Sequence, residues 1–250
     1  MKSLTPVADG VHRYADGLVN WYLVEDGGEL LLVDSGWPTS WSKIVAAVDS
    51  LGRTPADLRS VLLTHGHADH LGSAERVRRE WNVPVRVRDA EVGRVTGRDK
   101  GSSSFALVPK LLPQLWRPAA FGFVLHAAYH GFMTPRWVTE VMPFEDGATL
   151  DLPGRPQAVG TPGHTAGHTS YVLPGRGVLL AGDALVTLDP MTRERGPRLL
   201  PDALTDDPAT ARSSLSALQP LAADVLLPGH GEPWQGSPSE AVRKAHIALG

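Results

Sequence analysis

The sequence contains no cysteine among its 250 residues. This absence excludes disulfide bonds, cysteine-ligated zinc, iron–sulfur clusters and cysteine nucleophiles. There is also no uninterrupted apolar run of about 18 residues, so we expect no transmembrane segment. No apolar stretch follows the single lysine near the N-terminus, so no secretory signal is visible and a cytoplasmic location is expected.

The sequence also lacks an excess of positive charge. It has 24 Lys and Arg against 27 Asp and Glu, which gives a formal net charge of −3. A nucleic-acid binder needs a basic face to neutralise phosphates, so the expected partner is a small-molecule substrate and no nucleic acid. The length suits a single domain over 1–250 with a substantial core. Nothing in the sequence predicts the oligomeric state.

Short apolar runs alternate with helical patterns along the chain. The runs predict strands at 11–14, 19–24, 30–33, 60–64, 83–87, 157–160, 170–173, 177–181 and 224–227. Apolar spacing and N-cap residues predict helices at about 44–51 and 73–81, and helices that begin after 207 and 237. This alternation indicates a layered α/β fold.

The stretch 96–143 does not follow the alternation. It is rich in Leu, Phe, Trp and Pro and has few acidic residues, which favours an insertion of short helices. One interpretation is that its apolar residues pack on the core, since exposed apolar surface is unfavourable. The other is a lid over a site, with an apolar substrate pocket beneath it. The sequence leaves both open, together with a dimer contact.

The clearest chemical signal is the segment THGHADH at 64–70. It places three histidines and one carboxylate within six residues, directly after an apolar strand. Imidazole nitrogens and carboxylate oxygens are the usual zinc ligands when cysteine is absent. In a loop, His65 and His67 can point to one metal while Asp69 and His70 point to a second.

Three further ligand-type residues lie at predicted strand ends. His164 stands in TPGHTAGH, Asp183 in LLAGDA and His230 in LLPGHG. Glycine is a neighbour in each case and allows the backbone to approach a metal closely. Together with the four residues of the first motif they make seven ligands, enough for two metals that share a solvent position.

In their order along the chain, these motifs resemble those of metallo-β-lactamase-fold hydrolases, and the resemblance runs from Asp34 to His230. The pattern is most similar to the glyoxalase II and lactonase-like branches. It implies a four-layer αβ/βα sandwich with the metals at one edge. It also implies a first metal on His65, His67 and His164, a second on Asp69, His70 and His230, and Asp183 as the bridge. Asp34 would not bind a metal itself but would orient one of the ligand residues, and His168 would support the site.

The implied chemistry is hydrolysis by a hydroxide shared between two cations, which lower the pKa of water. Asp69 would be the catalytic residue that orients this nucleophile and shuttles its proton. We expect two Zn²⁺ ions, with iron or manganese as possible replacements. The expected substrate is an ester, lactone or thioester with an apolar acyl part.

Motifs beyond the ligand set distinguish the branches of the superfamily. Familiar lactamases usually replace the bridging aspartate, which is present here as Asp183. The glyoxalase II branch shares HTAGH, but 184–198 lacks its glutathione-side pattern. Lactonases commonly have tyrosine three residues after the bridge, where this chain has Val186. Three alternatives remain: a glyoxalase II-like thioester hydrolase, a mononuclear iron oxidoreductase like the persulfide dioxygenases, and a metal-binding protein without turnover.

Within the insertion, the residues from Phe105 to Trp137 are expected to roof the substrate pocket. Trp116, Phe123 and Tyr129 are the predicted aromatic contacts, and Tyr129 could replace the missing phenol. His126 and His130 are spaced i, i+4 and would share a helix face. We expect a structural or substrate-contacting role for these two histidines rather than a third metal site.

Overall fold

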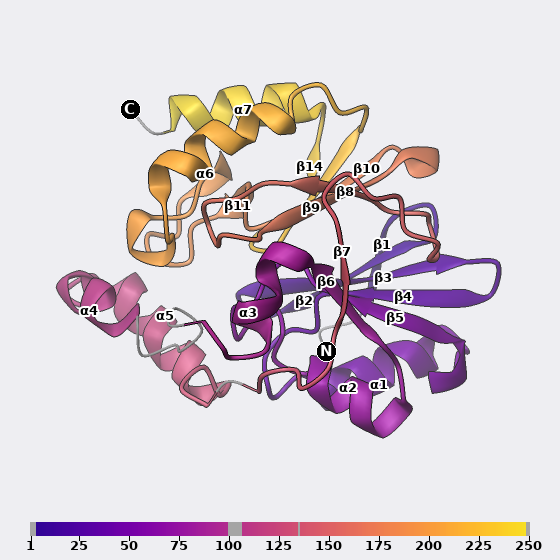
Figure 1. Cartoon of the computed structure of the whole chain (residues 1–250). Helices are drawn as coiled ribbons and strands as arrows, with labels where there is room; N and C mark the ends of the chain where they lie inside the picture. Colours follow the sequence, from indigo (N-terminus) through magenta and orange to yellow (C-terminus); the bar gives the residue numbers. More distant parts are fainter. Residues whose placement is uncertain (1–3, 100–106, 135, 249–250) are drawn as a thin grey trace.

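A computed structural model describes residues 4–99, 107–134 and 136–248. Two β-sheets face each other and helices cover both outer faces, so the chain forms four layers (Figure 1). The first sheet has the order β1 (Thr5–Ala8), β2 (Val11–Asp16), β3 (Val19–Asp26), β4 (Glu29–Val33), β5 (Leu58–Leu62), β6 (Val85–Arg88) and β7 (Met142–Phe144). Neighbours are antiparallel from β1 to β4 and parallel from β4 to β7.

The second sheet has the order β14 (Trp234–Gln235), β13 (Val225–Pro228), β10 (Val178–Gly182), β9 (Thr169–Leu173) and β8 (Gln157–Gly160). Only β10 and β13 run parallel; the other neighbours are antiparallel. β11 (Val186–Leu188) and β12 (Arg195–Arg198) form a separate two-stranded sheet.

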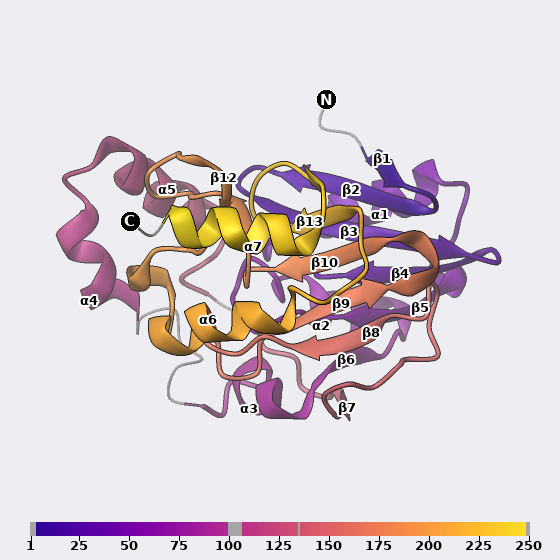
Figure 2. The same cartoon turned by 90° about the horizontal axis from the view of Figure 1, so that it is seen from above.

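Four helices complete the layers. α1 (Trp41–Ser50) and α2 (Ala74–Trp81) lie on the outer face of the first sheet, and α6 (Pro208–Ser214) and α7 (Pro238–Ile247) cover the second (Figures 1 and 2). Short 3₁₀ turns lie at Pro55–Asp57, Asp89–Glu91, Leu112–Gln114, Pro174–Arg176, Asp202–Leu204 and Leu215–Ala217. The α/β sandwich predicted from the motifs is confirmed.

Strand β4 illustrates why the sequence folds into layers. Leu30 and Leu32 pack toward α1 and α2, whereas Leu31 and Val33 pack between the sheets. Successive side chains of a strand point to opposite faces, so a strand that is covered on both faces reads as a continuous apolar run. This is the pattern from which the strand was predicted.

Helix α7 begins where its capping residues predict. The Ser237 side chain accepts a hydrogen bond from the Glu240 amide at 3.2 Å, and proline occupies the first helical position. Asp207 caps α6 in the same way and accepts from the Thr210 amide at 3.0 Å. Such caps satisfy amides that have no partner within the helix.

The described part of the stretch 96–143 includes α4 (Val108–Leu111) and α5 (Pro118–Tyr129), which lie at one end of the layers (Figures 1 and 2). α3 (Val92–Val95) precedes them. The stretch ends in strand β7, which pairs in parallel with β6 and was not expected from the sequence. Met142 is largely exposed, so β7 shows no buried apolar pattern. Among the described residues, no helix is long and apolar enough to cross a membrane.

Candidate metal centre

The ligand-type residues lie where strands end. Asp34 follows β4, the segment 64–70 begins two residues after β5, Asp183 follows β10 and His230 lies just after β13. These strands belong to the parallel pairs of the two sheets, and the carboxyl ends of parallel strands meet at one edge. His164 approaches from the loop after β8. The fold therefore brings residues from both halves of the sequence to one site.

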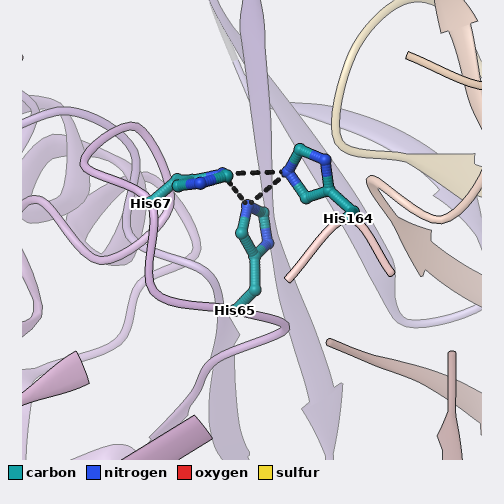
Figure 3. Close-up of side chains that lie close together, drawn as sticks. All are labelled: His65, His67 and His164. Carbon is teal, nitrogen blue, oxygen red and sulfur yellow. Dashed lines mark hydrogen bonds between the residues drawn. The ribbon is translucent and has the colours of Figure 1, made fainter. Parts of the chain in front are cut away.

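Three histidine nitrogens converge at its centre (Figure 3). His65 Nε2 lies 3.1 Å from His67 Nδ1 and 3.2 Å from His164 Nε2, and the last two atoms are 2.9 Å apart. Two nitrogens bound to one tetrahedral zinc ion at about 2.0–2.1 Å would be about 3.3 Å apart. The triangle is therefore close to the size that such an ion requires.

A second group lies beside the first. The Asp69 Oδ2 atom is 3.8 Å from His70 Nε2 and 3.6 Å from His230 Nε2, and these three residues could hold a metal ion. His70 Nε2 is buried and has no hydrogen-bond partner among the described residues. A bound cation would satisfy this nitrogen, so the donor set fits the metals implied by the sequence.

Asp183 lies between the two groups. Its Oδ2 atom is 3.3 Å from His164 Nε2 and 3.1 Å from His230 Nε2, while its Oδ1 atom is 3.5 Å from His70 Nε2. The carboxylate is buried, and Oδ1 has no hydrogen-bond partner in the described part of the chain. One carboxylate thus faces histidines of both groups, which is the position that a bridging ligand requires.

The first group consists of neutral bases. Burial lowers the pKa of His65 and His67 well below the ordinary value, and lowers that of His164 to about 4. Neutral imidazole is the form that binds a metal, because the protonated ring has no free lone pair.

The second group contains a carboxylate, Asp69, and its histidines face Asp183 as well, so carboxylates favour the protonated form of these histidines. Burial alone would lower the pKa of His70, but the facing carboxylates, Asp183 first, raise it well above its ordinary value. His230 shows the same balance, with burial opposed by Asp183. Burial would raise the pKa of Asp183, yet His230 and His70 hold it well below its ordinary value. Burial raises the pKa of Asp69.

Two residues fix the orientation of these histidines. Asp34 accepts a hydrogen bond from His70 Nδ1 at 2.8 Å and another from the Thr64 amide at 2.8 Å. The carbonyl of Leu18 accepts from His230 Nδ1. Both rings therefore direct Nε2 toward Asp183. An outer partner of this kind selects the tautomer that can bind a metal.

His168 lies behind Asp183. Its Nε2 atom accepts a hydrogen bond from the Asp183 amide at 2.9 Å, and its Nδ1 atom is 2.8 Å from the Thr161 hydroxyl. Both ring nitrogens are therefore engaged, and neither faces the two groups. His168 thus contacts the backbone of the loop that carries Asp183.

Sequence reasoning missed Glu91, a buried acid between β6 and α3. Its carboxylate accepts hydrogen bonds from Gly66 and Gly167, which lie in two different histidine-bearing loops. Burial raises its pKa to about 7, although Arg94 and the hydrogen bonds oppose this. Glu91 stands four residues before the buried Val95, and residues at this spacing lie on the same face of a helix. This spacing is the signal that could have predicted the burial of Glu91.

One cavity lies over the site and a second adjoins it. The first is lined by residues of both groups together with Leu107, Phe123 and Phe132. The second, of about 120 Å³, lies within the stretch 108–133 and is lined by apolar residues of α4, of the turn that follows it, of α5 and of the segment after α5. Phe123 and Phe132 line both cavities. The apolar cavity thus shares a wall with the cavity that the metal-ligand groups line.

The other predicted substrate contacts lie elsewhere. Trp116 and Tyr129 are 76% and 83% exposed, and neither lines either cavity. The rings of His126 and His130 both lie 5.7 Å from the ring of Trp37, and His130 Nδ1 is 2.7 Å from the Thr39 hydroxyl. The structure thus places these histidines against the body of the protein. Of the predicted roof, Phe105 lies outside the described residues.

Comparison with known proteins gives consistent results. The family model of the metallo-beta-lactamase superfamily matches residues 14–230. A protein described as a probable metallo-hydrolase, YflN of Bacillus subtilis, is 31% identical over 243 residues, covering 92% of this chain and 86% of that protein.

Solved structures agree with the family match. The metallo-beta-lactamase family protein TTHA1429 of Thermus thermophilus superposes with a TM-score of 0.68 at 25% identity and covers 96% of this chain and 80% of its own. TTHA1623 in a di-iron-bound form superposes with a TM-score of 0.65 at 25% identity, covering 97% and 99%. The di-iron form is a property of that protein.

Proposed function

The chain belongs to the metallo-beta-lactamase superfamily, and from this premise we propose that it is a dinuclear metal-dependent hydrolase of esters, lactones or thioesters with an apolar acyl part. The observation that carries the proposal is the position of Asp183, whose two oxygens face histidines of two separate ligand groups. A single metal site would not require this arrangement.

We assign the first cation to His65, His67 and His164, and the second to Asp69, His70 and His230, with Asp183 between them. Zinc is the proposed metal, because an all-histidine and carboxylate donor set of this size suits it. The di-iron form of a solved relative makes iron the second candidate. When bound, divalent cations lower the pKa of water and polarise a carbonyl group.

Residues of the chain supply the remaining steps. Asp69, buried and facing the cavity, accepts the proton of the water that attacks the carbonyl carbon. The bond from the acyl carbon to the leaving oxygen or sulfur then breaks, and the leaving group takes up the proton that Asp69 accepted. Asp34 and the Leu18 carbonyl hold His70 and His230 in the required tautomers throughout.

The apolar cavity between α4 and α5 is the proposed acyl pocket. The side chains of Phe123 and Phe132 form a wall that it shares with the cavity over the ligand groups. A pocket lined only by apolar atoms stabilises an alkyl chain and offers no partner for a charged or strongly polar substituent. We therefore expect this cavity to receive a simple acyl chain rather than a peptide-like group such as glutathione.

The test is a hydrolysis panel on metal-loaded protein, comprising lactones, aryl esters, acyl thioesters and β-lactams. We expect turnover of at least one of the first three classes, abolished by a chelator and by His67→Ala. His246→Ala is the matched control, because this exposed histidine lies on α7, which covers the outer face of the second sheet, and lines neither cavity. A single retained iron with oxygen consumption and no hydrolysis would replace the proposal with the oxidoreductase alternative.

A further inference from the structure

Glu91 joins the two loops that carry the first ligand group. Its Oε1 atom accepts a hydrogen bond from the Gly66 amide at 2.9 Å. Its Oε2 atom accepts from the Thr165 hydroxyl at 2.9 Å and from the Gly167 amide at 2.7 Å. Gly66 lies between His65 and His67, and Thr165 directly follows His164. One carboxylate therefore spans the loops from which all three nitrogens come.

The two loops belong to different sheets. The loop with Gly66 follows β5 of the first sheet, whereas the loop with Thr165 follows β8 of the second. The Thr169 amide donates to the Thr64 carbonyl at 3.0 Å and joins the loops near their bases. Glu91 adds a second connection at Gly66 and Thr165, the residues next to the histidines.

The surroundings leave the carboxylate little freedom. Glu91 is 1% exposed, and a Cβ atom added at Gly167 would lie 2.4 Å from the Glu91 amide nitrogen. Arg94 Nε lies 3.7 Å from Glu91 Oε1, and Arg94 also forms an ion pair with Asp206. The Asp206 amide in turn donates to the His164 carbonyl at 3.1 Å. The same loop is thus held at a second point.

We propose that Glu91 is a positioning residue that sets the distance between His164 and the His65–His67 pair, and with it the metal affinity of this group. The inference rests on the proposed function, since it takes these three histidines as metal ligands. Outer partners of ligating side chains typically change metal affinity or activity by about 10–100-fold when they are lost.

Glutamine is an informative replacement because it has nearly the same shape. A carboxylate offers two acceptor oxygens, whereas an amide offers one oxygen and one NH₂ group. In Glu91→Gln, the NH₂ group must face either the Gly66 amide or the donors of Thr165 and Gly167. One loop therefore loses its acceptor and meets a second donor in its place.

The experiment titrates metal-free protein with Co²⁺, using the visible absorption spectrum as the readout of coordination. We expect Glu91→Gln to weaken binding of the Co²⁺ ion held by the three histidines by about 10–100-fold. The visible spectrum of that ion should also change. Glu75→Gln is the matched control. Glu75 also accepts from a backbone amide and a hydroxyl, both of Thr139, and from Arg78, but it contacts no histidine-bearing loop.

Several outcomes separate the possibilities. If Glu91→Gln lowers only the melting temperature and leaves Co²⁺ affinity and spectrum as in the wild type, Glu91 stabilises the fold and the inference is wrong. If the wild type itself binds no Co²⁺, the proposed function fails first. Should Glu91→Gln not fold, Thr165→Val removes a single donor while keeping the shape, and a smaller loss of affinity is expected; an unchanged affinity there overturns the inference.

Discussion

Phe123 offers the sharpest test of the acyl pocket. Its side chain is 5% exposed and lines both the cavity over the ligand groups and the apolar cavity beyond it. Burying one methylene group contributes about 0.8 kcal/mol, which corresponds to about a fourfold gain in kcat/KM. In the wild type, kcat/KM should therefore rise by about this factor for each of the first few carbons of the acyl chain, until the pocket is full.

Phe123→Ala removes the wall that the two cavities share. The methylene groups that contacted the ring lose their partner, so the gain for each carbon should fall at short chain lengths and the optimum should move to longer chains. For the best wild-type substrate, a lost apolar contact of about 1–3 kcal/mol lowers kcat/KM by about 10–200-fold.

The assay is a series of acyl esters of one alcohol, measured on metal-loaded protein at substrate concentrations below KM. Phe121→Ala is the control, because Phe121 lies on the same helix, is 50% exposed and lines neither cavity. Removing Phe123 will also cost about 3–5 kcal/mol of stability, so melting temperatures are recorded for each variant. A flat chain-length profile in the wild type, unchanged by Phe123→Ala, would refute the pocket.

Three further predictions address the metal-ligand groups and their support. Asp69→Asn should reduce turnover by about 10²–10⁴-fold because it removes a proton acceptor, whereas Asp183→Asn should lose bound metal first, as elemental analysis and kinetics on the same samples will show. Carboxylates raise the pKa of His70 and His230, so protons compete with the metal for these nitrogens up to a higher pH than they do at an ordinary histidine. The metal affinity of the second group, measured by competition with a chelator, should therefore still rise above about pH 6.5. A plateau of the metal affinity there would contradict this. Burial raises the pKa of Glu91 to about 7 in the folded protein, so the folded state keeps this proton above about pH 4.3, where the unfolded state has lost it. The free energy of unfolding of the wild type, relative to Glu91→Gln, should therefore fall between about pH 4.3 and 7. Denaturation of the metal-free proteins across this pH range measures it.

The sequence predicts the architecture well where a residue's position depends on a simple repeat. Buried strands such as β4 read as apolar runs, and the helix starts at Asp207 and Ser237 follow from capping chemistry. Asp183 and His230 could be expected at strand ends for the same reason, since each follows an apolar run and stands next to glycine. Strands β7 and β11 were missed because both are only three residues long.

Other features depend on tertiary packing that no local pattern reveals. Trp116 and Tyr129 are large aromatic residues that sequence reasoning places in a pocket, yet both are mostly exposed. The reverse holds for Glu91. This charged residue stands in a charged segment, yet its side chain is almost completely buried. Its burial is possible because Gly66 and Gly167, distant in sequence, bring hydrogen-bond donors to it.

The central claim is that hydrolysis depends on two cations held by the two ligand groups around Asp183. It is tested most directly by restoring a divalent metal stepwise to chelator-treated protein and measuring the hydrolytic rate on the best substrate of the panel at each step. The account predicts a rate near zero without metal and a rise that saturates near two equivalents for each chain. Full activity in the metal-free protein, or saturation at one equivalent, would contradict it.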